Sequence, residues 1–88
     1  MTEKQYNEFI GGDFVSNEQK FFIGQVIGDK RKEMGLTQKE LALKTELSRS
    51  YICDLEAGRY TPSVKSLVAI SSVLELDLNF LTQMTEIQ

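Results

Sequence analysis

Four residues with side chains suited to recognition chemistry lie close together: Arg49, Ser50, Cys53 and Asp54. In a helix, Cys53 and Asp54 lie one turn after Arg49 and Ser50 on the same face. A guanidinium donates two parallel hydrogen bonds, a hydroxyl donates or accepts, and a carboxylate accepts. These groups predict a surface that binds a partner through hydrogen bonds.

Residue combinations that catalyse reactions or hold metals are absent from the sequence. The chain of 88 residues has no histidine and one cysteine, Cys53, which cannot form an internal disulfide. Without a nucleophile and base, a metal-ligand cluster or a phosphate loop, we expect no enzyme activity, no metal and no cofactor. The single cysteine, the polar N-terminus and the lack of a long apolar run indicate a cytoplasmic protein without a membrane span.

The segment that must position the polar cluster runs from residue 36 to 58, LTQKELALKTELSRSYICDLEAG. Thr37 and Glu40 have the spacing of a capping box, which predicts the start of a helix. Ser48 is a second candidate N-cap, for a helix over about 48–57, and Gly58 is suited to the left-handed residue that ends it. Two short helices joined by a tight turn predict a helix-turn-helix.

Apolar periodicity predicts further helices on both sides of this segment. The first spans 21–34, with a stripe that includes Ile23 and Ile27, and Gly24 and Gly28 leave room for a neighbouring helix. Thr61 as N-cap and Pro62 at the first position predict a helix over 63–74. Its expected buried residues are Val64, Leu67, Val68, Ile70 and Leu74.

Asp77 is a candidate N-cap for a last short helix that contains Leu78, Phe80 and Leu81. We therefore predict an all-α fold, with a helix-turn-helix domain over 21–83 and a frayed tail over 84–88. Residues 1–20 form an N-terminal extension of uncertain order. It is either a frayed arm tethered by a few aromatic side chains, which its acidity favours, or an arm that contacts a dimer partner or DNA.

Charge is distributed unevenly along the chain. The net charge is −3, whereas residues 30–65 carry eight Lys and Arg against five Asp and Glu. The acidic total argues against a nucleic-acid binder, but the basic excess coincides with the helix-turn-helix. The excess is either a solvated surface or a surface for a DNA backbone.

The run from Ile23 to Leu81 resembles the Cro/cI-type (XRE) helix-turn-helix family, which has the lambda-repressor-like fold of five helices. Its matching features are Arg31, the Leu-Thr-Gln before the second helix, the Ser-x-Ser-Tyr-Ile run, Glu56-x-Gly58 and the helix begun by Pro62. The sequences around RKEMG and SYICDLE resemble those of short phage and biofilm repressors. The segment RSYI resembles the matching segment of restriction-modification controller proteins. The resemblance also implies an ion pair between Arg31 and Glu56, in place of two separate exposed charges.

The resemblance implies that the helix over 48–57 enters the major groove of double-stranded DNA with its N-terminal end. Arg49 could then contact guanine O6 and N7, and Ser50 could bond several bases. Asp54 could accept from cytosine N4 or reject a wrong site, or it is a solvated acid. Cys53 lies on the same face and is a further candidate for a base contact; the alternative is that it is only a small residue of the helix.

Other residues are candidates for contacts with the DNA backbone, which position a protein without reading sequence. Tyr51 is open between such a contact and a half-buried core position. The candidate contacts to the DNA backbone are Gln38, Ser48, Tyr51, Arg59, Tyr60, Lys39 and Lys65.

The family resemblance implies a homodimer on an inverted-repeat operator. The candidate dimer residues are the apolar ones near the C-terminus, Leu76, Leu78, Phe80, Leu81 and Met84. We expect a sequence-specific transcriptional regulator, a repressor. The alternative is an antitoxin-like or antirepressor module of the same fold that acts mainly through a regulatory protein partner.

Overall fold

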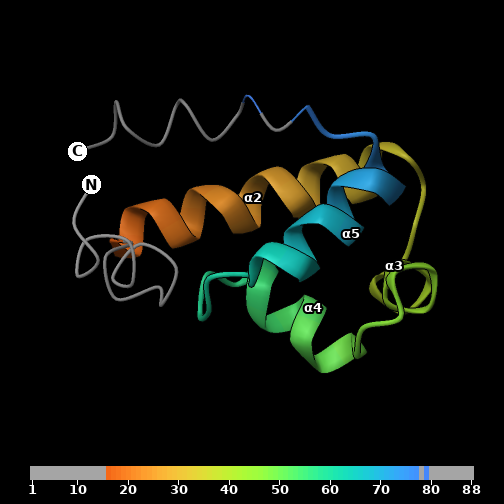
Figure 1. Ribbon diagram of the computed structural model, residues 1–88, viewed down its shortest axis with the longest axis horizontal. Coiled ribbons are helices and arrows are strands. Elements are labelled where there is room, and N and C mark those ends of the chain that lie inside the picture. Colours follow the sequence, from red (N-terminus) through yellow and green to blue (C-terminus); the bar gives the residue numbers. More distant parts are fainter. Residues whose placement is uncertain (1–15, 78, 80–88) are drawn as a thin grey trace.

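This computed structural model describes residues 16–77 and 79 of the chain, and these residues contain four helices (Figure 1). They are α2 (Asn17–Glu33), α3 (Gln38–Thr45), α4 (Arg49–Glu56) and α5 (Val64–Leu74). No strand occurs among these residues, and the predicted all-α class is confirmed. Only Asp77 and Asn79 of the predicted last helix are described, and Asp77 Oδ1 accepts a hydrogen bond from the Asn79 amide at 2.9 Å. The rest of that helix lies outside the described residues.

The first described helix starts earlier than the sequence analysis expected. Ser16 Oγ accepts from the Gln19 amide at 3.2 Å, and Gln19 Oε1 accepts from the Ser16 amide at 2.9 Å. This reciprocal capping box begins α2 at Asn17. The predicted start at residue 21 was wrong, and residues 17–20, assigned to an N-terminal arm, form the first turn of α2. The remainder of that predicted arm lies outside the described residues.

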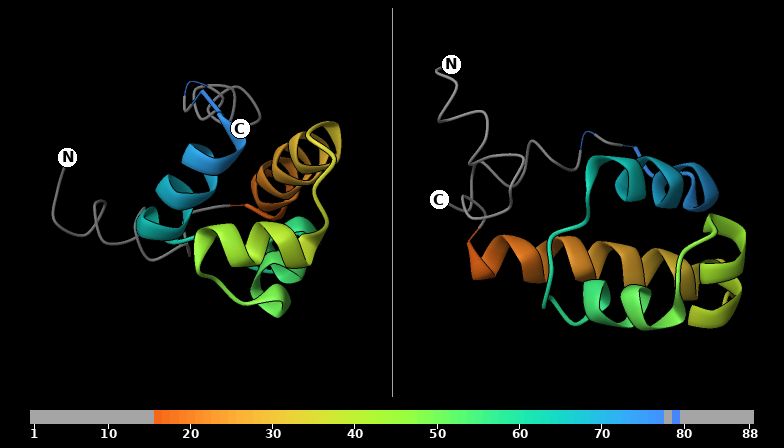
Figure 2. Two further views of the ribbon diagram at one scale, coloured as in Figure 1. Left: turned by 90° about the vertical axis from the view of Figure 1, so that its right-hand side faces the viewer. Right: turned by 60° about the horizontal axis from the view of Figure 1, so that its bottom comes forward.

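The core is built from two side chains of each helix. In the right-hand view of Figure 2, α2 runs between α5 above and α4 below, and α3 contacts both α4 and α5. The buried apolar residues are Ile23, Ile27, Leu41, Ala42, Ile52, Leu55, Ile70 and Leu74. Since α3 and α4 each contribute to this core, both helices of the predicted helix-turn-helix are held by it.

The last described helix, α5, differs from the prediction in its N-cap and in its buried residues. Its N-cap is Ser63, whose Oγ accepts from the Ser66 amide at 3.1 Å, so the helix begins at Val64 instead of following a Thr61 cap. Val64 and Val68, expected in the core, are 63% and 54% exposed. The inward stripe is formed by Ser66, Ile70, Ser71 and Leu74. Ser66 and Ser71 are 7% and 6% exposed, so small polar residues occupy inward positions of α5 while the two valines lie at the surface.

Gly24 brings α4 close to α2. A Cβ at Gly24 would lie 2.3 Å from the Leu55 carbonyl oxygen, and one at Gly28 would lie 3.2 Å from Glu56 Oε1. The predicted role of both glycines in close helix packing is confirmed. Their absent side chains allow the C-terminal end of α4 to lie against the middle of α2.

Candidate nucleic-acid interface

The two helices of the helix-turn-helix are joined by a three-residue turn, Glu46, Leu47 and Ser48. Glu46 adopts a left-handed conformation with φ of 59°, and the Leu47 amide donates to the Ala42 carbonyl at 3.0 Å. Thr45, at the end of α3, donates its hydroxyl to the Leu41 carbonyl at 2.8 Å. These bonds close α3 locally, so the direction of α4 is set within a few residues of the turn.

Side-chain caps fix where α3 and α4 begin. Thr37 Oγ1 accepts from the Glu40 amide at 3.0 Å, and Glu40 Oε1 accepts from the Thr37 amide at 2.9 Å. The hydrogen bond from the Thr37 amide lowers the pKa of Glu40 below its ordinary value. Ser48 Oγ accepts from the Tyr51 amide at 3.0 Å. Both predicted N-caps are confirmed, and the Ser48 hydroxyl is therefore engaged in capping α4.

The two faces of α4 differ in burial. Ile52 and Leu55 are fully buried, whereas Arg49, Ser50 and Cys53 are exposed. In Figure 1 the N-terminal end of α4 lies at the lower edge of the molecule, away from α2 and α5. Within residues 16–77 and 79, the Arg49 side chain has no hydrogen-bonding or ionic partner. Its guanidinium is therefore available to an external ligand.

Asp54, one turn further along α4, is held by an ion pair. Its Oδ1 accepts from Arg59 Nη1 at 2.9 Å, with the side chain of Arg59 61% exposed and that of Asp54 29% exposed. Hydrogen bonding to Asp54 raises the pKa of Arg59, and the negative charge of Asp54 acts in the same direction. Asp54 and Arg59 were predicted to have separate roles, as a base contact and a backbone contact, and this pair was not predicted.

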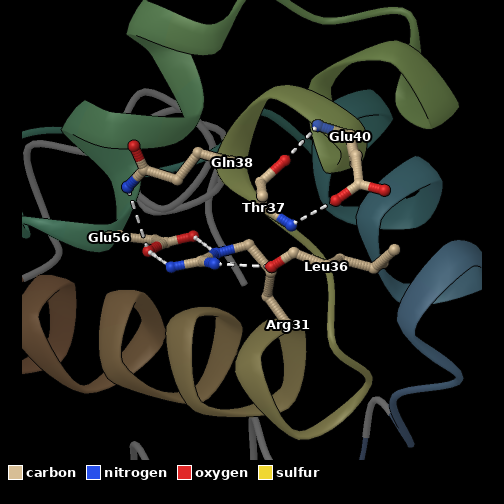
Figure 3. A network of polar contacts seen from close by, with 6 residues as sticks. All are labelled: Arg31, Leu36, Thr37, Gln38, Glu40 and Glu56. Carbon is tan, nitrogen blue, oxygen red and sulfur yellow. Dashed lines mark hydrogen bonds and ion pairs between the residues drawn. The ribbon is translucent and has the colours of Figure 1, made fainter.

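The Arg31–Glu56 pair joins the last part of α2 to the end of α4. Arg31 Nε donates to Glu56 Oε2 at 2.7 Å and its Nη2 donates to Oε1 at 3.0 Å, while Nη1 donates to the Leu36 carbonyl at 2.7 Å (Figure 3). The side chains are only 9% and 11% exposed. Hydrogen bonding to Glu56 raises the pKa of Arg31, although burial acts in the opposite direction. The structure thus contains the bidentate pair that the resemblance implied.

Gln38, a predicted phosphate contact, is part of the same network. Its Nε2 donates to Glu56 Oε1 at 3.2 Å, and its side chain extends from the start of α3 toward the carboxylate (Figure 3). Glu56 therefore receives bonds from both α2 and α3. The amide group of Gln38 helps to fix the angle between α3 and α4.

The other predicted backbone contacts occupy different environments. Tyr51 is half-buried against the core, and its hydroxyl accepts from the Ser63 amide at 3.3 Å. This geometry matches the core alternative for Tyr51. Lys39 on α3, Tyr60 in the loop after α4 and Lys65 on α5 are exposed. Only Lys39 of these three lies on a helix of the helix-turn-helix.

A protein-family model described as helix-turn-helix matches residues 27–81, more than half of the chain. The chain belongs to this helix-turn-helix family. The match spans α3, the turn and α4, together with most of the helices that support them, and it confirms the resemblance described above.

Several relatives of this helix-turn-helix protein come from Bacillus and its phages. The chain is 52% identical over 66 residues to the ImmF control region 10 kDa protein of Bacillus phage phi105, covering 75% of this chain and 72% of the relative. It is 46% identical over 57 residues to the immunity repressor protein of the same phage, covering 65% and 40%. It is 38% identical over 60 residues to the transcriptional regulator SinR of Bacillus subtilis, covering 67% and 54%. The chain thus spans about half or less of the length of the immunity repressor and of SinR.

The predicted dimer surface of this family member is described only at its first residue. Leu76 is half-buried and packs against the core, so part of its side chain is already used within the domain. Leu78, Phe80, Leu81 and Met84 lie outside the described residues. The dimer surface remains a prediction.

The described residues contain neither a membrane-spanning helix nor a cluster of metal ligands. None of the helices in residues 16–77 and 79 is long and apolar enough to cross a membrane. The same residues contain no group of three or more Cys, Asp or Glu side chains placed to hold a metal ion.

Proposed function

We propose that this protein is a transcriptional repressor that binds double-stranded DNA in a sequence-specific manner. The observation that carries the proposal is the exposed Arg49, which has no partner among the described residues and lies in the first turn of a helix whose opposite face is buried. A recognition helix presents its first residues to base edges, and an arginine there can donate to guanine O6 and N7 together. The helix-turn-helix family and the relatives named as repressor and regulator support the same function.

In the proposed complex, α4 inserts its N-terminal end in the major groove. Arg49 contacts a guanine, and Ser50 and Cys53 face neighbouring bases. Lys39 and Tyr60 lie at the surface, as contacts to the sugar-phosphate backbone require. Two copies bind an inverted repeat whose half-sites are about 34–36 Å apart, since a single inserted helix contacts few base pairs.

Selection of binding sites from random duplex DNA tests this function. We expect the wild type to enrich an inverted repeat, and Arg49→Ala to lose preference at one base position of each half-site. The expected discrimination at that position is about 1–3 kcal/mol. Lys32→Ala is the matched control because it removes one exposed positive charge from α2, outside the helix-turn-helix. No enrichment by folded wild-type protein would overturn the proposal.

A second candidate is a module that acts mainly through a protein partner. It is favoured by the net charge of −3 and by the exposed Val64 and Val68 on α5. A salt titration distinguishes the two functions. Binding through several phosphates falls steeply as salt rises, whereas binding through an apolar interface responds little.

A further inference from the structure

The end of α4 is built so that residue 59 lies over residue 54. The Arg59 amide donates to the Asp54 carbonyl at 3.0 Å, and the Gly58 amide donates to the Leu55 carbonyl at 3.1 Å. Gly58 has a φ of 75°, which is the left-handed conformation of this type of helix end. The backbone alone therefore brings the two side chains together, and the Asp54–Arg59 ion pair is pre-arranged.

The other three described helices end with the same backbone bond but with a different side chain. Leu36, Leu47 and Leu76 each donate their amide to a carbonyl five residues earlier, and all three leucines pack against the core. An apolar contact is the usual companion of this helix end. At α4 alone among them, the position holds an arginine, and a charged contact with Asp54 replaces the apolar one.

The Asp54–Arg59 pair is open to exchange with an external anion. Arg59 offers a largely exposed guanidinium and makes one bond to the carboxylate, and exposed ion pairs are weak because water and salt screen them. Asp54 lies on α4, the helix proposed to enter DNA, one turn beyond Ser50, and Arg59 lies in the loop that follows this helix. A DNA phosphate would meet both a cation that it attracts and a carboxylate that it repels.

We infer that Asp54 is a specificity-determining residue that competes with DNA phosphates for Arg59, an inference that rests on the proposed DNA-binding function. On DNA of unrelated sequence, a phosphate that Arg59 binds lies beside the Asp54 carboxylate, which repels the phosphate and keeps one N–H of Arg59. At the preferred site, a cytosine amino group replaces Arg59 as the donor to Asp54 and frees Arg59 for a phosphate. The exchange of partners therefore penalises wrong sequences more than the right one.

The test compares wild type and Asp54→Asn on two probes over a range of salt concentrations. One probe is the duplex selected from random DNA as described above, and the other is a mixed-sequence duplex of equal length. For Asp54→Asn on mixed-sequence DNA, we expect tighter binding and a salt slope steeper by about 0.9, the value for one added phosphate contact. The affinity ratio between the two probes should fall roughly fivefold or more, because the mixed-sequence duplex gains a phosphate contact and a neutral amide oxygen accepts more weakly than a carboxylate from cytosine N4.

Two control variants isolate the pair from a simple change of charge. Asp29→Asn makes the same chemical change at an exposed position on α2, and it should leave the affinity ratio at the wild-type value. In an Arg59→Gln background, Asp54→Asn should no longer steepen the salt slope on mixed-sequence DNA. Denaturant unfolding of each variant establishes that it is folded.

The outcomes separate this inference from the function on which it rests. If the wild type binds neither probe, both are overturned. If the wild type prefers the selected duplex and Asp54→Asn keeps the same affinity ratio, only the role of Asp54 is overturned. If Asp29→Asn lowers the ratio as much as Asp54→Asn does, overall charge explains the effect and the inference is again overturned.

Discussion

Two arginine–carboxylate pairs, both anchored on α4, differ in almost every physical respect. Arg31 and Glu56 are about 90% buried and form a fork of two bonds, with a third bond from the arginine to the Leu36 carbonyl. Asp54 and Arg59 share one bond at the surface. A buried charge that loses its partner is costly, whereas an exposed one is hydrated by water. The first pair therefore holds the fold, and the second is free to take part in binding.

The spacing along α4 makes this division possible. Glu56 follows Asp54 by two residues, which is about 200° around a helix, so the two carboxylates point to different sides. Glu56 faces α2 and α3, while Asp54 faces the loop that follows α4. Four predictions, in order of decreasing effect, test how sharply the two pairs differ.

Glu56→Ala has the largest expected effect on stability. It leaves the Arg31 guanidinium buried without its carboxylate, and removing one partner of a buried pair costs about 3–5 kcal/mol. Urea denaturation should show a much lower midpoint. Glu33→Ala is the control, because Glu33 pairs with Lys30 at the surface and its removal should leave the midpoint nearly unchanged. An unchanged midpoint for Glu56→Ala would refute the structural role of the buried pair.

Gly24→Ala tests the close approach that brings Glu56 to Arg31. The added Cβ meets the Leu55 carbonyl at 2.3 Å, a backbone atom that cannot move alone. We expect a loss of about 1–3 kcal/mol from overpacking, measured by thermal or urea unfolding. Gly28→Ala is the matched control, since its Cβ meets only the Glu56 side chain at 3.2 Å. Equal losses at the two glycines would contradict this account of the α2–α4 contact.

Gln38→Ala removes the third donor to the Glu56 carboxylate. The bond from Gln38 Nε2 is long, at 3.2 Å, and a hydrogen bond of this kind contributes about 1 kcal/mol. Urea unfolding should reveal that loss in the absence of DNA. If stability is unchanged while DNA affinity falls, Gln38 serves only as the phosphate contact predicted from the sequence.

Asp54→Asn should have the smallest effect on stability. The pair is exposed, and the backbone bonds that end α4 do not depend on its side chains. We expect a urea midpoint equal to that of the wild type, together with the altered DNA preference described above. A large loss of stability would show that the surface pair also holds the fold, and the contrast between the two pairs would disappear.

Local sequence signals predicted the helix-turn-helix correctly. The Thr37–Glu40 box, the Ser48 cap and Gly58 all act within a few residues of chain, so their patterns can be recognised directly. The same kind of signal was present but overlooked at Ser16, where Ser-x-x-Gln begins α2. The Asp54–Arg59 pair could also have been found, because a glycine at the end of a helix brings the residues five apart together.

Tertiary packing decided what local patterns left open. Val64 and Val68 fit a buried stripe as well as Ile70 and Leu74 do, yet α5 buries Ser66 and Ser71 and leaves the two valines exposed. Likewise, no local rule brings Gln38 to Glu56, 18 residues away. That contact requires α2, α3 and α4 to meet around one carboxylate.

The sequence by itself therefore determined the starts of α3 and α4, the turn between them and the exposed polar end of α4, since caps, glycines and periodicity act over one or two turns. The tertiary structure decided which arginine is free. Arg31, Arg49 and Arg59 carry the same group, yet Arg31 is buried with Glu56, Arg59 is shared with Asp54 and Arg49 faces solvent. The physical reason is that burial and the nearest carboxylate, both products of packing, set what each guanidinium can bind.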